Sequence, residues 1–260
     1  MSSPLRTDAL AGRRVAVTGA TGGIGQRIAE RLAGSGAELV LQYRSSAEVA
    51  HGLATSLPTP GHHVVRADLS EPSGARAFWR EALGRTDDRL DALVLGAAIA
   101  PATGLDAPDT DWDTVWRETF DVNVLASVAL LREAGRTFAA RGAGTIVVIS
   151  SWAAEQGSRI ESAIAYAASK AAVRNAAQSL ARLLADQGVT VHILAPGVVD
   201  AGMGIVGSDP AVHAVSPEVS RTGHLVGADE VATLVALLLS GSVPSMTGST
   251  VDLNGASYIR

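Results

Sequence analysis

Tyr166 and Lys170 are the residues whose types and spacing most directly suggest chemistry. They frame the run Tyr166-Ala-Ala-Ser-Lys170, and Lys170 is the only lysine among the 21 lysine and arginine residues of the chain. Because residues i and i+4 share one face of a helix, this spacing predicts an ammonium beside a phenol. A nearby ammonium favours the phenolate and is expected to lower the tyrosine pKa, which suits proton transfer near neutral pH. Every other position with a lysine or an arginine holds arginine, which is a planar fork that stays protonated. This suggests that arginine cannot take the place of lysine at position 170.

Spacing alone leaves a second interpretation open, since a tyrosine and a lysine four residues apart are usually a surface pair. Residues 163–172 are otherwise almost entirely alanine, serine and isoleucine. A large polar pair therefore stands on a helix of small residues that can pack closely against its neighbours.

The glycine-rich turn at residues 19–25, Gly-Ala-Thr-Gly-Gly-Ile-Gly, is the second segment with chemical potential. A β-rich run at 13–18 precedes it, and a helical pattern with Ile24, Ile28 and Leu32 on one face follows. Free N–H groups and the helix dipole point at such a turn, and glycines let the backbone approach a pyrophosphate. Strand, turn and helix in this order predict a dinucleotide site, although glycines with a purely structural role remain the alternative.

The residues after the second predicted strand indicate which dinucleotide is bound. An acidic residue there would hydrogen-bond the ribose of NAD, whereas a basic residue suits the additional phosphate of NADP. The sequence reads Gln42-Tyr43-Arg44-Ser45-Ser46 and contains no acid. Arg44 can offer a bidentate fork and Ser45 a hydroxyl, so we predict NADP(H), against the alternative of a solvated loop arginine.

The elements that must position these residues alternate between strand and helix. Uninterrupted apolar strands of this kind are typical of a parallel sheet buried on both faces, so we predict an α/β fold, a doubly wound seven-stranded parallel sheet in three layers, forming a single domain over 1–260. The irregular segment 198–227 is predicted to be a substrate lid. We expect strands at 13–18, 38–42, 63–67, 90–95, 144–150, 189–195 and 249–253, and helices from 24 and at 47–57, 74–83, 111–141, 163–187 and 229–239.

Composition excludes several classes of function. A net charge of −5 gives no electrostatic footprint for nucleic acid, and the absence of cysteine excludes disulfides and thiolate chemistry. We predict no metal site. No apolar run reaches the length of a membrane span, and residues 1–14 lack the apolar core of a signal peptide. A cytoplasmic protein without membrane association is therefore expected.

The motifs Thr18-Gly19-x-x-x-Gly23-x-Gly25 and Tyr166-x-x-x-Lys170, with the alternating strand and helix order, closely resemble the short-chain dehydrogenase/reductase family. The resemblance runs from about Gly12 to the C-terminus and is greatest to 3-oxoacyl-carrier-protein reductases and related ketoreductases. It implies a Rossmann-type fold, and it makes a surface role for Tyr166 and Lys170 much harder to sustain.

The resemblance also implies roles for individual residues. Ser151 matches the serine that hydrogen-bonds the substrate carbonyl, and Asn123 matches the asparagine that holds a water in a proton relay. Tyr166 would be the proton donor and Lys170 would grip the nicotinamide ribose. The cofactor-binding residues implied are Gly19, Thr21, Gly22, Gly23, Ile24, Gly25, Tyr43, Arg44, Ser45, Asp68, Leu69, Ala97, Tyr166, Lys170, Pro196, Gly197 and Val199.

Three positions depart from the family pattern. Gly96 replaces an asparagine whose side chain braces the strands, Ala98 replaces a glycine near the cofactor, and Ala201 replaces a threonine that bonds the carboxamide. The segment between Ser151 and Tyr166 is about two residues longer than in similar proteins. These departures indicate a substrate other than a fatty-acyl thioester.

The resulting hypothesis is an NADPH-dependent ketoreductase in biosynthesis, acting on a free or carrier-bound polyketide-like ketone or on a small cyclic ketone. The same residues could serve an alcohol dehydrogenase running in reverse, and the altered motif edges leave open an NADP-binding sensor without turnover. By resemblance, the two long helices and the last strand would form a homotetramer, or a homodimer.

Overall fold

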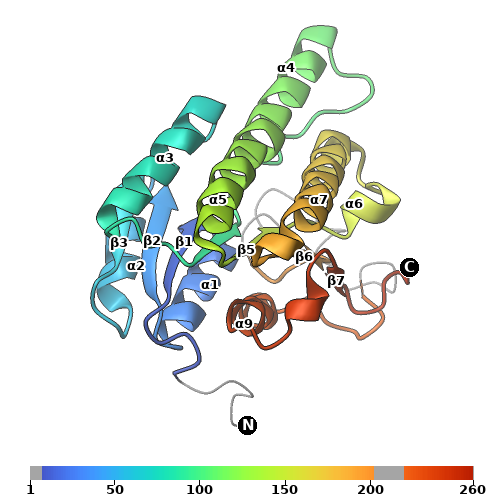
Figure 1. The fold of residues 1–260 in the computed structure, drawn as a ribbon. Helices are drawn as coiled ribbons and strands as arrows, with labels where there is room; N and C mark the ends of the chain where they lie inside the picture. Colours follow the sequence, from blue (N-terminus) through green and yellow to red (C-terminus); the bar gives the residue numbers. More distant parts are fainter. Residues whose placement is uncertain (1–7, 202–219, 260) are drawn as a thin grey trace.

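The computed structural model describes residues 8–201 and 220–259 of the chain. A seven-stranded parallel sheet in the order β3-β2-β1-β4-β5-β6-β7 forms its centre, with helices on both faces (Figure 1). The strands are β1 (Arg14–Thr18), β2 (Glu38–Tyr43), β3 (His63–Arg66), β4 (Ala92–Leu95), β5 (Gly144–Ile149), β6 (Val189–Pro196) and β7 (Thr250–Leu253). The order proceeds outward in both directions from the neighbouring strands β1 and β4, which confirms the predicted doubly wound α/β fold.

The helices of both layers follow the predicted alternation. They are α1 (Gly23–Ala33), α2 (Ala47–Ser56), α3 (Pro72–Arg85), α4 (Asp109–Phe120), α5 (Ser127–Arg141), α6 (Ala153–Gln156), α7 (Ile164–Leu184) and α9 (Ala228–Leu239). Short 3-10 turns lie at Glu161–Ala163, Ala185–Gln187 and Pro244–Met246. None of the helices within 8–201 and 220–259 combines the length and apolarity needed to cross a membrane.

Alternate residues of the central strands face the two helix layers. In β4, Ala92 and Val94 contribute to the core that includes α1 and α9, whereas Leu93 and Leu95 contribute to the core of α3, α5 and α7. All four side chains are buried. Burial on both faces is the physical reason for the unbroken apolar runs in the sequence.

Strand register brings the predicted site residues to one edge of the sheet. Thr18 pairs with Leu95, and Ile149 pairs with Leu194, so the loops that leave β1, β4, β5 and β6 begin at the same level. Because all strands are parallel, this carboxyl edge collects segments that lie far apart in the sequence.

The helix predicted over 111–141 is interrupted by a π-helical stretch, Asp121–Ala126, between α4 and α5. π-helical turns are rare and frequently mark functional sites. This one carries Asn123.

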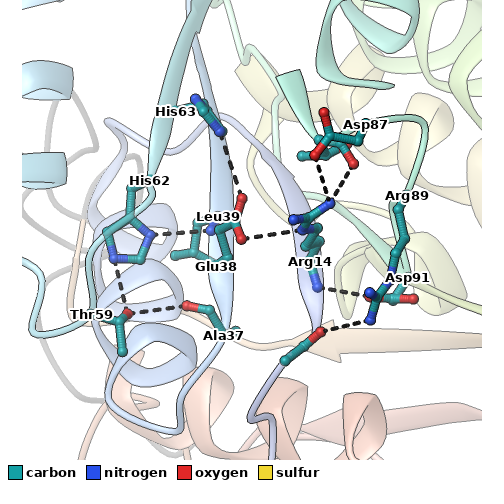
Figure 2. A network of polar contacts seen from close by, with 12 residues as sticks. Arg14, Ala37, Glu38, Leu39, Thr59, His62, His63, Asp87, Arg89 and Asp91 are labelled. Carbon is teal, nitrogen blue, oxygen red and sulfur yellow. Dashed lines mark hydrogen bonds and ion pairs between the residues drawn. The ribbon is translucent and has the colours of Figure 1, made fainter. Parts of the chain in front are cut away.

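Figure 2 shows a polar network at the opposite, amino edge of the sheet. Glu38, at the start of β2, lies between Arg14 of β1 (3.2 Å) and His63 of β3 (3.6 Å). Beside it, Nδ1 of His62 accepts the backbone N–H of Leu39 at 3.1 Å. These contacts tie together the starts of three strands, away from the predicted site.

Most of the segment predicted as a lid, namely residues 202–219, lies outside the described residues. Its two ends are joined by a parallel bridge between Val199 and Val226. The lid, like the single-domain organisation, stays a prediction.

Candidate active site

Tyr166, Lys170 and Ser151 meet at the carboxyl edge of the sheet. The first two lie on α7, and Ser151 follows β5. The Tyr166 side chain is hydrogen-bonded to that of Ser151, and Lys170 Nζ lies 5.6 Å from the centroid of the Tyr166 ring. The predicted i, i+4 geometry therefore places ammonium, phenol and serine hydroxyl side by side.

Two hydrogen bonds in opposite directions hold α7 to the end of β5. Lys170 Nζ donates to the carbonyl oxygen of Ile149 at 2.7 Å, and Ser150 Oγ donates to the carbonyl oxygen of Lys170 at 3.1 Å. The buried residues of α7 beside them, Ala167 and Ser169, are small, which allows the helix to lie close to the strand. These two hydrogen bonds and the small side chains therefore fix the position of α7 against the end of β5.

Burial dominates the protonation of both groups. Burial raises the pKa of Tyr166 to about 12, and the hydrogen bond with Ser151 acts in the opposite direction. Burial likewise lowers the pKa of Lys170 to about 8. The expectation that Lys170 lowers the Tyr166 pKa is therefore wrong for this arrangement, because loss of hydration raises the pKa and only the hydrogen bond with Ser151 opposes it. Tyr166 keeps its proton at neutral pH.

Asn123 connects the π-helical stretch to both the active-site helix α7 and the loop after β4. Its Oδ1 accepts the backbone N–H of Ile99 at 2.8 Å, and its Nδ2 donates to the carbonyl oxygen of Ile99 at 2.8 Å and to Ser169 Oγ at 3.0 Å. Ser169 Oγ in turn donates to the carbonyl oxygen of Tyr166 at 2.7 Å. Both amide protons of Asn123 are used, so a water on this side chain would have to donate to Oδ1.

The glycine-rich turn has the backbone geometry of a phosphate cradle. Helix α1 begins at Gly23, and its N-cap, Gly22, makes no side-chain capping bond, so α1 presents backbone N–H groups to the turn. A Cβ at Gly25 would lie 2.1 Å from the carbonyl oxygen of Gly19. Gly19 itself has a φ of +68°, and a Cβ there would lie 2.8 Å from the Cα of Ala97. Of the other residues predicted here, Thr21 lies in the turn and Ile24 in the first turn of α1.

Thr18 braces the strands where the family pattern uses an asparagine. Its Oγ1 is fully buried and accepts the backbone N–H groups of Gly96 (3.1 Å) and Ala97 (3.2 Å). A Cβ at residue 96 would lie 2.9 Å from the carbonyl oxygen of Thr18, so glycine suits this close approach. In the sequence, Thr18 stood out only as part of the glycine motif. Its bracing role depends on a hydrogen bond to Gly96, which lies 78 positions away along the chain.

Two arginines gather where the adenosine end of a dinucleotide is predicted. Arg44 and Ser45 are exposed after β2, beside the half-buried Tyr43. Arg66 of β3 pairs in register with Tyr43, and its Nε donates to the carbonyl oxygen of Arg44 at 3.3 Å. Sequence reasoning missed Arg66, because only the pairing of β2 with β3 brings it beside Arg44.

Asp68 and Leu69 follow β3 at the same place. The Asp68 carboxylate accepts the backbone N–H of Ser70 at 2.9 Å, and this bond, with smaller contributions from Arg44 and Arg66, lowers the Asp68 pKa. Leu69 is buried. The carboxylate is thus anchored to its own turn and stays ionised.

The end of β6 lies next to the segment that carries Ser151. The carbonyl oxygen of Pro196 accepts the backbone N–H of Trp152 at 2.9 Å, and the N–H of Gly197 donates to the carbonyl oxygen of Leu253 at 2.7 Å. Val199 is buried, and Ala201 packs against the core of α1 and α9. Pro196 therefore lies beside the segment that carries Ser151, and the cofactor contacts of Pro196, Gly197 and Val199 stay predictions.

Side-chain contacts fasten the segment between Ser151 and Tyr166 to its surroundings. Glu155 forms an ion pair with Arg174 of α7. The Glu161 carboxylate accepts the backbone N–H of Leu105 at 2.5 Å, which joins this segment to the loop after β4. Gly104 allows this approach, since a Cβ there would lie 3.1 Å from Glu161 Oε1. The segment before α7 and the loop after β4 are thus joined directly.

Comparison with known proteins places the chain in a family. A family model described as enoyl-(acyl carrier protein) reductase matches residues 19–255. The dehydrogenase/reductase SDR family member 4 of Bos taurus is 33% identical over 250 residues, covering 93% of this chain and 85% of the relative. The 3-oxoacyl-[acyl-carrier-protein] reductase of Escherichia coli is 30% identical over 248 residues, covering 95% and 98%.

Solved structures agree with this assignment. A short-chain dehydrogenase of Burkholderia cenocepacia, solved in complex with NADP, superimposes with a TM-score of 0.84 at 32% identity, covering 96% of this chain and 99% of that one. With the family model and two full-length relatives, this similarity shows that the chain belongs to the short-chain dehydrogenase/reductase family of oxidoreductases.

Proposed function

We propose that the chain is an NADPH-dependent ketoreductase in which Tyr166 protonates the oxygen of a ketone. The observation that carries the proposal is the hydrogen bond between Tyr166 and Ser151 with Lys170 beside the ring. Tyr166, with a pKa of about 12, holds its proton until the substrate oxygen becomes basic enough to take it.

Ser151 would stabilise the same oxygen. Its Oγ accepts the backbone N–H of Ala153 at 3.3 Å, which orients the hydroxyl and leaves its own proton available for donation. Two hydroxyl donors converging on one oxygen stabilise the negative charge that develops there.

Lys170 and Asn123 would supply the proton that Tyr166 loses. The Lys170 pKa of about 8 lies close to neutral pH, so its Nζ can release and regain a proton there. The position of Asn123 is held by Ile99 and Ser169. A water that donates a hydrogen bond to Oδ1 of Asn123 would complete the proton path from solvent.

The residues at the carboxyl edge fit NADP(H). Bound NADPH supplies the hydride for the carbonyl carbon. The turn from Gly19 to Gly25 would hold its pyrophosphate, and Arg44, Ser45 and Arg66 would hold its 2′-phosphate. The NADP in the Burkholderia cenocepacia relative supports this choice. Around the remainder of the cofactor we propose Tyr43, Asp68, Leu69, Ala97, Lys170, Pro196, Gly197 and Val199.

For the substrate, we propose a ketone that is carried on an acyl carrier protein or is a small cyclic compound. The name of the Escherichia coli relative supports a carrier-bound ketone. The exposed polar residues Glu155, Gln156 and Arg159 on the segment beside the site favour a polar rather than a plain fatty-acyl substrate. We further propose a biosynthetic, cytoplasmic homotetramer, which light scattering after size exclusion would test.

Oxidation of an alcohol by the same residues is the second candidate, because Tyr166 and Lys170 serve either direction. The raised Tyr166 pKa favours reduction, since oxidation needs the phenolate as base.

The proposal is tested by NADPH oxidation against a panel containing a β-ketoacyl thioester, a cyclic ketone and an aldehyde. Turnover is expected for at least one ketone and is expected to be lost in Tyr166→Phe, with NADPH affinity retained. Turnover that survives in Tyr166→Phe would remove the proton-donor role. Tight NADPH binding without turnover on any carbonyl compound would favour a cofactor-binding sensor.

A further inference from the structure

Gln42 is a buried polar residue at the cofactor edge whose side chain bridges two loops. It lies near the end of β2 and is 3% exposed. Its Oε1 accepts the backbone N–H of Gly19 at 2.9 Å, and its Nε2 donates to the carbonyl oxygen of Ala67 at 2.8 Å. Its own carbonyl oxygen accepts the N–H of Ala20 at 3.1 Å.

The two loops joined by this amide are the ones that the proposed cofactor site needs. Gly19 opens the glycine-rich turn, and Ala67 directly precedes Asp68. A buried amide is costly unless its groups are hydrogen-bonded, and here Oε1 and Nε2 are each bonded to a backbone group. The bridge therefore sets the separation between the pyrophosphate turn and the adenosine loop.

Gly19 is also confined from the other side. Its backbone stands so close to Ala97 that a Cβ would lie 2.8 Å from the Ala97 Cα, and its φ of +68° lies in a range that residues with a side chain rarely adopt. With Gln42 bonded to its N–H, the first residue of the turn is held between β2 and the loop after β4 before any ligand arrives. Preorganisation of this kind improves affinity by removing the entropy cost of ordering a loop on binding.

We propose that Gln42 is a positioning residue for the dinucleotide, which sets the affinity for the adenosine-diphosphate half without taking part in the reduction. This inference rests on the proposed use of NADPH. Gln42 does not touch the reacting atoms in this assignment, so its loss is expected to weaken binding and to leave the rate at saturating NADPH nearly unchanged.

The test is fluorescence titration of NADPH and calorimetric titration of 2′,5′-ADP into Gln42→Met and Gln42→Asn. Methionine keeps the volume but removes both bonds, and a tenfold or larger rise in both dissociation constants is expected, a tenfold rise being about 1.4 kcal/mol. Asparagine is one methylene shorter and can reach only one partner, so an intermediate rise is expected.

The matched control is Thr190→Val, which removes the hydrogen bond of 3.1 Å to the buried Thr145 near the amino edge of the sheet. Thr190→Val should lower the unfolding free energy about as much as Gln42→Met does. Its NADPH affinity should equal that of the wild-type protein. Wild-type affinity in Gln42→Met, or an equal loss of affinity in Thr190→Val, would overturn the proposal. Absence of NADPH binding by the wild-type protein would instead refute the proposed function.

Discussion

Lys170 donates from Nζ to the carbonyl oxygen of Ile149 at 2.7 Å, and Lys170 is only 4% exposed. The chain's single lysine is therefore held between the end of β5 and the ring of Tyr166. A guanidinium is wider, planar and always protonated, so it cannot reproduce this contact without moving the strand or the tyrosine.

Lys170→Arg should therefore bind NADPH at least about tenfold more weakly and reduce ketones about a hundredfold more slowly, in the range typical of impaired proton transfer. Cofactor fluorescence and steady-state kinetics measure the two effects separately. Arg76→Lys on the exposed part of α3 is a control of similar chemistry and should change neither. Near-normal turnover in Lys170→Arg would mean that the choice of lysine is incidental.

Lys170 should also affect how stability depends on pH. Its pKa is about 8 in the folded protein and 10.5 for an unperturbed lysine, so between these two values the unfolded chain binds more protons. The unfolding free energy should consequently rise with pH across this window, by an amount on the order of 2 to 3 kcal/mol. Urea unfolding of the cofactor-free protein at pH 7.5 to 10.5 measures it. Lys170→Met should have a flatter profile, and identical slopes in both proteins would contradict the assigned burial cost.

His62 is expected to make the protein less stable in mild acid. Nδ1 accepts the Leu39 N–H and Nε2 lies 3.1 Å from Thr59 Oγ1, an arrangement that requires a neutral ring with its proton on Nε2 (Figure 2). Burial lowers the His62 pKa from 6.5, although Thr59 and Glu38 oppose the shift and His63 adds to it. Stability present above pH 6.5 should therefore be lost as the pH falls below that value.

Comparison of His62→Gln with the wild-type protein in urea between pH 7.5 and 5 tests this expectation. The variant should lose part of the acid sensitivity, whereas His51→Gln, which changes an exposed histidine, should not. Equal pH slopes in all three proteins would show that another group is responsible.

Arg44 and Arg66 should both contribute to the preference for NADPH. Arg44→Ala and Arg66→Ala are each expected to weaken NADPH binding about fivefold to thirtyfold, in line with charge-assisted bonds of roughly 1 to 2 kcal/mol, and to leave NADH binding nearly unchanged. Added salt should reduce the effect, because both side chains are exposed. If Arg44→Ala binds NADPH as tightly as before and the wild-type protein binds NADH equally well, the predicted 2′-phosphate site is wrong.

Glu161 should influence the substrate rather than the cofactor. Glu161→Ala removes the acceptor for the Leu105 N–H and should raise KM for the ketone several-fold, with the NADPH dissociation constant unchanged. Glu161→Gln retains an oxygen at Oε1 and should recover much of the loss. Glu118→Ala, at an exposed position of α4, is the control. A lower kcat at constant KM in Glu161→Ala would instead assign Glu161 to the chemical step.

Much of the fold follows from local patterns. The apolar runs at β4 and β5 predict buried parallel strands because both faces of each strand are covered, and the glycine turn predicts the start of α1. Tyr166 and Lys170 could be paired from sequence because four residues of helix fix their separation. The burial of these two side chains could not be predicted from the sequence. For that reason the predicted direction of the Tyr166 pKa shift was wrong. The catalytic and cofactor roles of the site residues stay predictions.

Contacts between distant segments account for what sequence reasoning missed. Thr18 reaches Gly96, Gln42 joins Gly19 to Ala67, and Arg66 lies beside Arg44 only because β2 pairs with β3. Chemistry that depends on residue type and short spacing is encoded locally and can be predicted from the chain. Burial, strand order and hydrogen bonds between remote residues arise only when the whole sheet assembles, and in this protein they determine the protonation of Tyr166 and Lys170 and the shape of the cofactor turn.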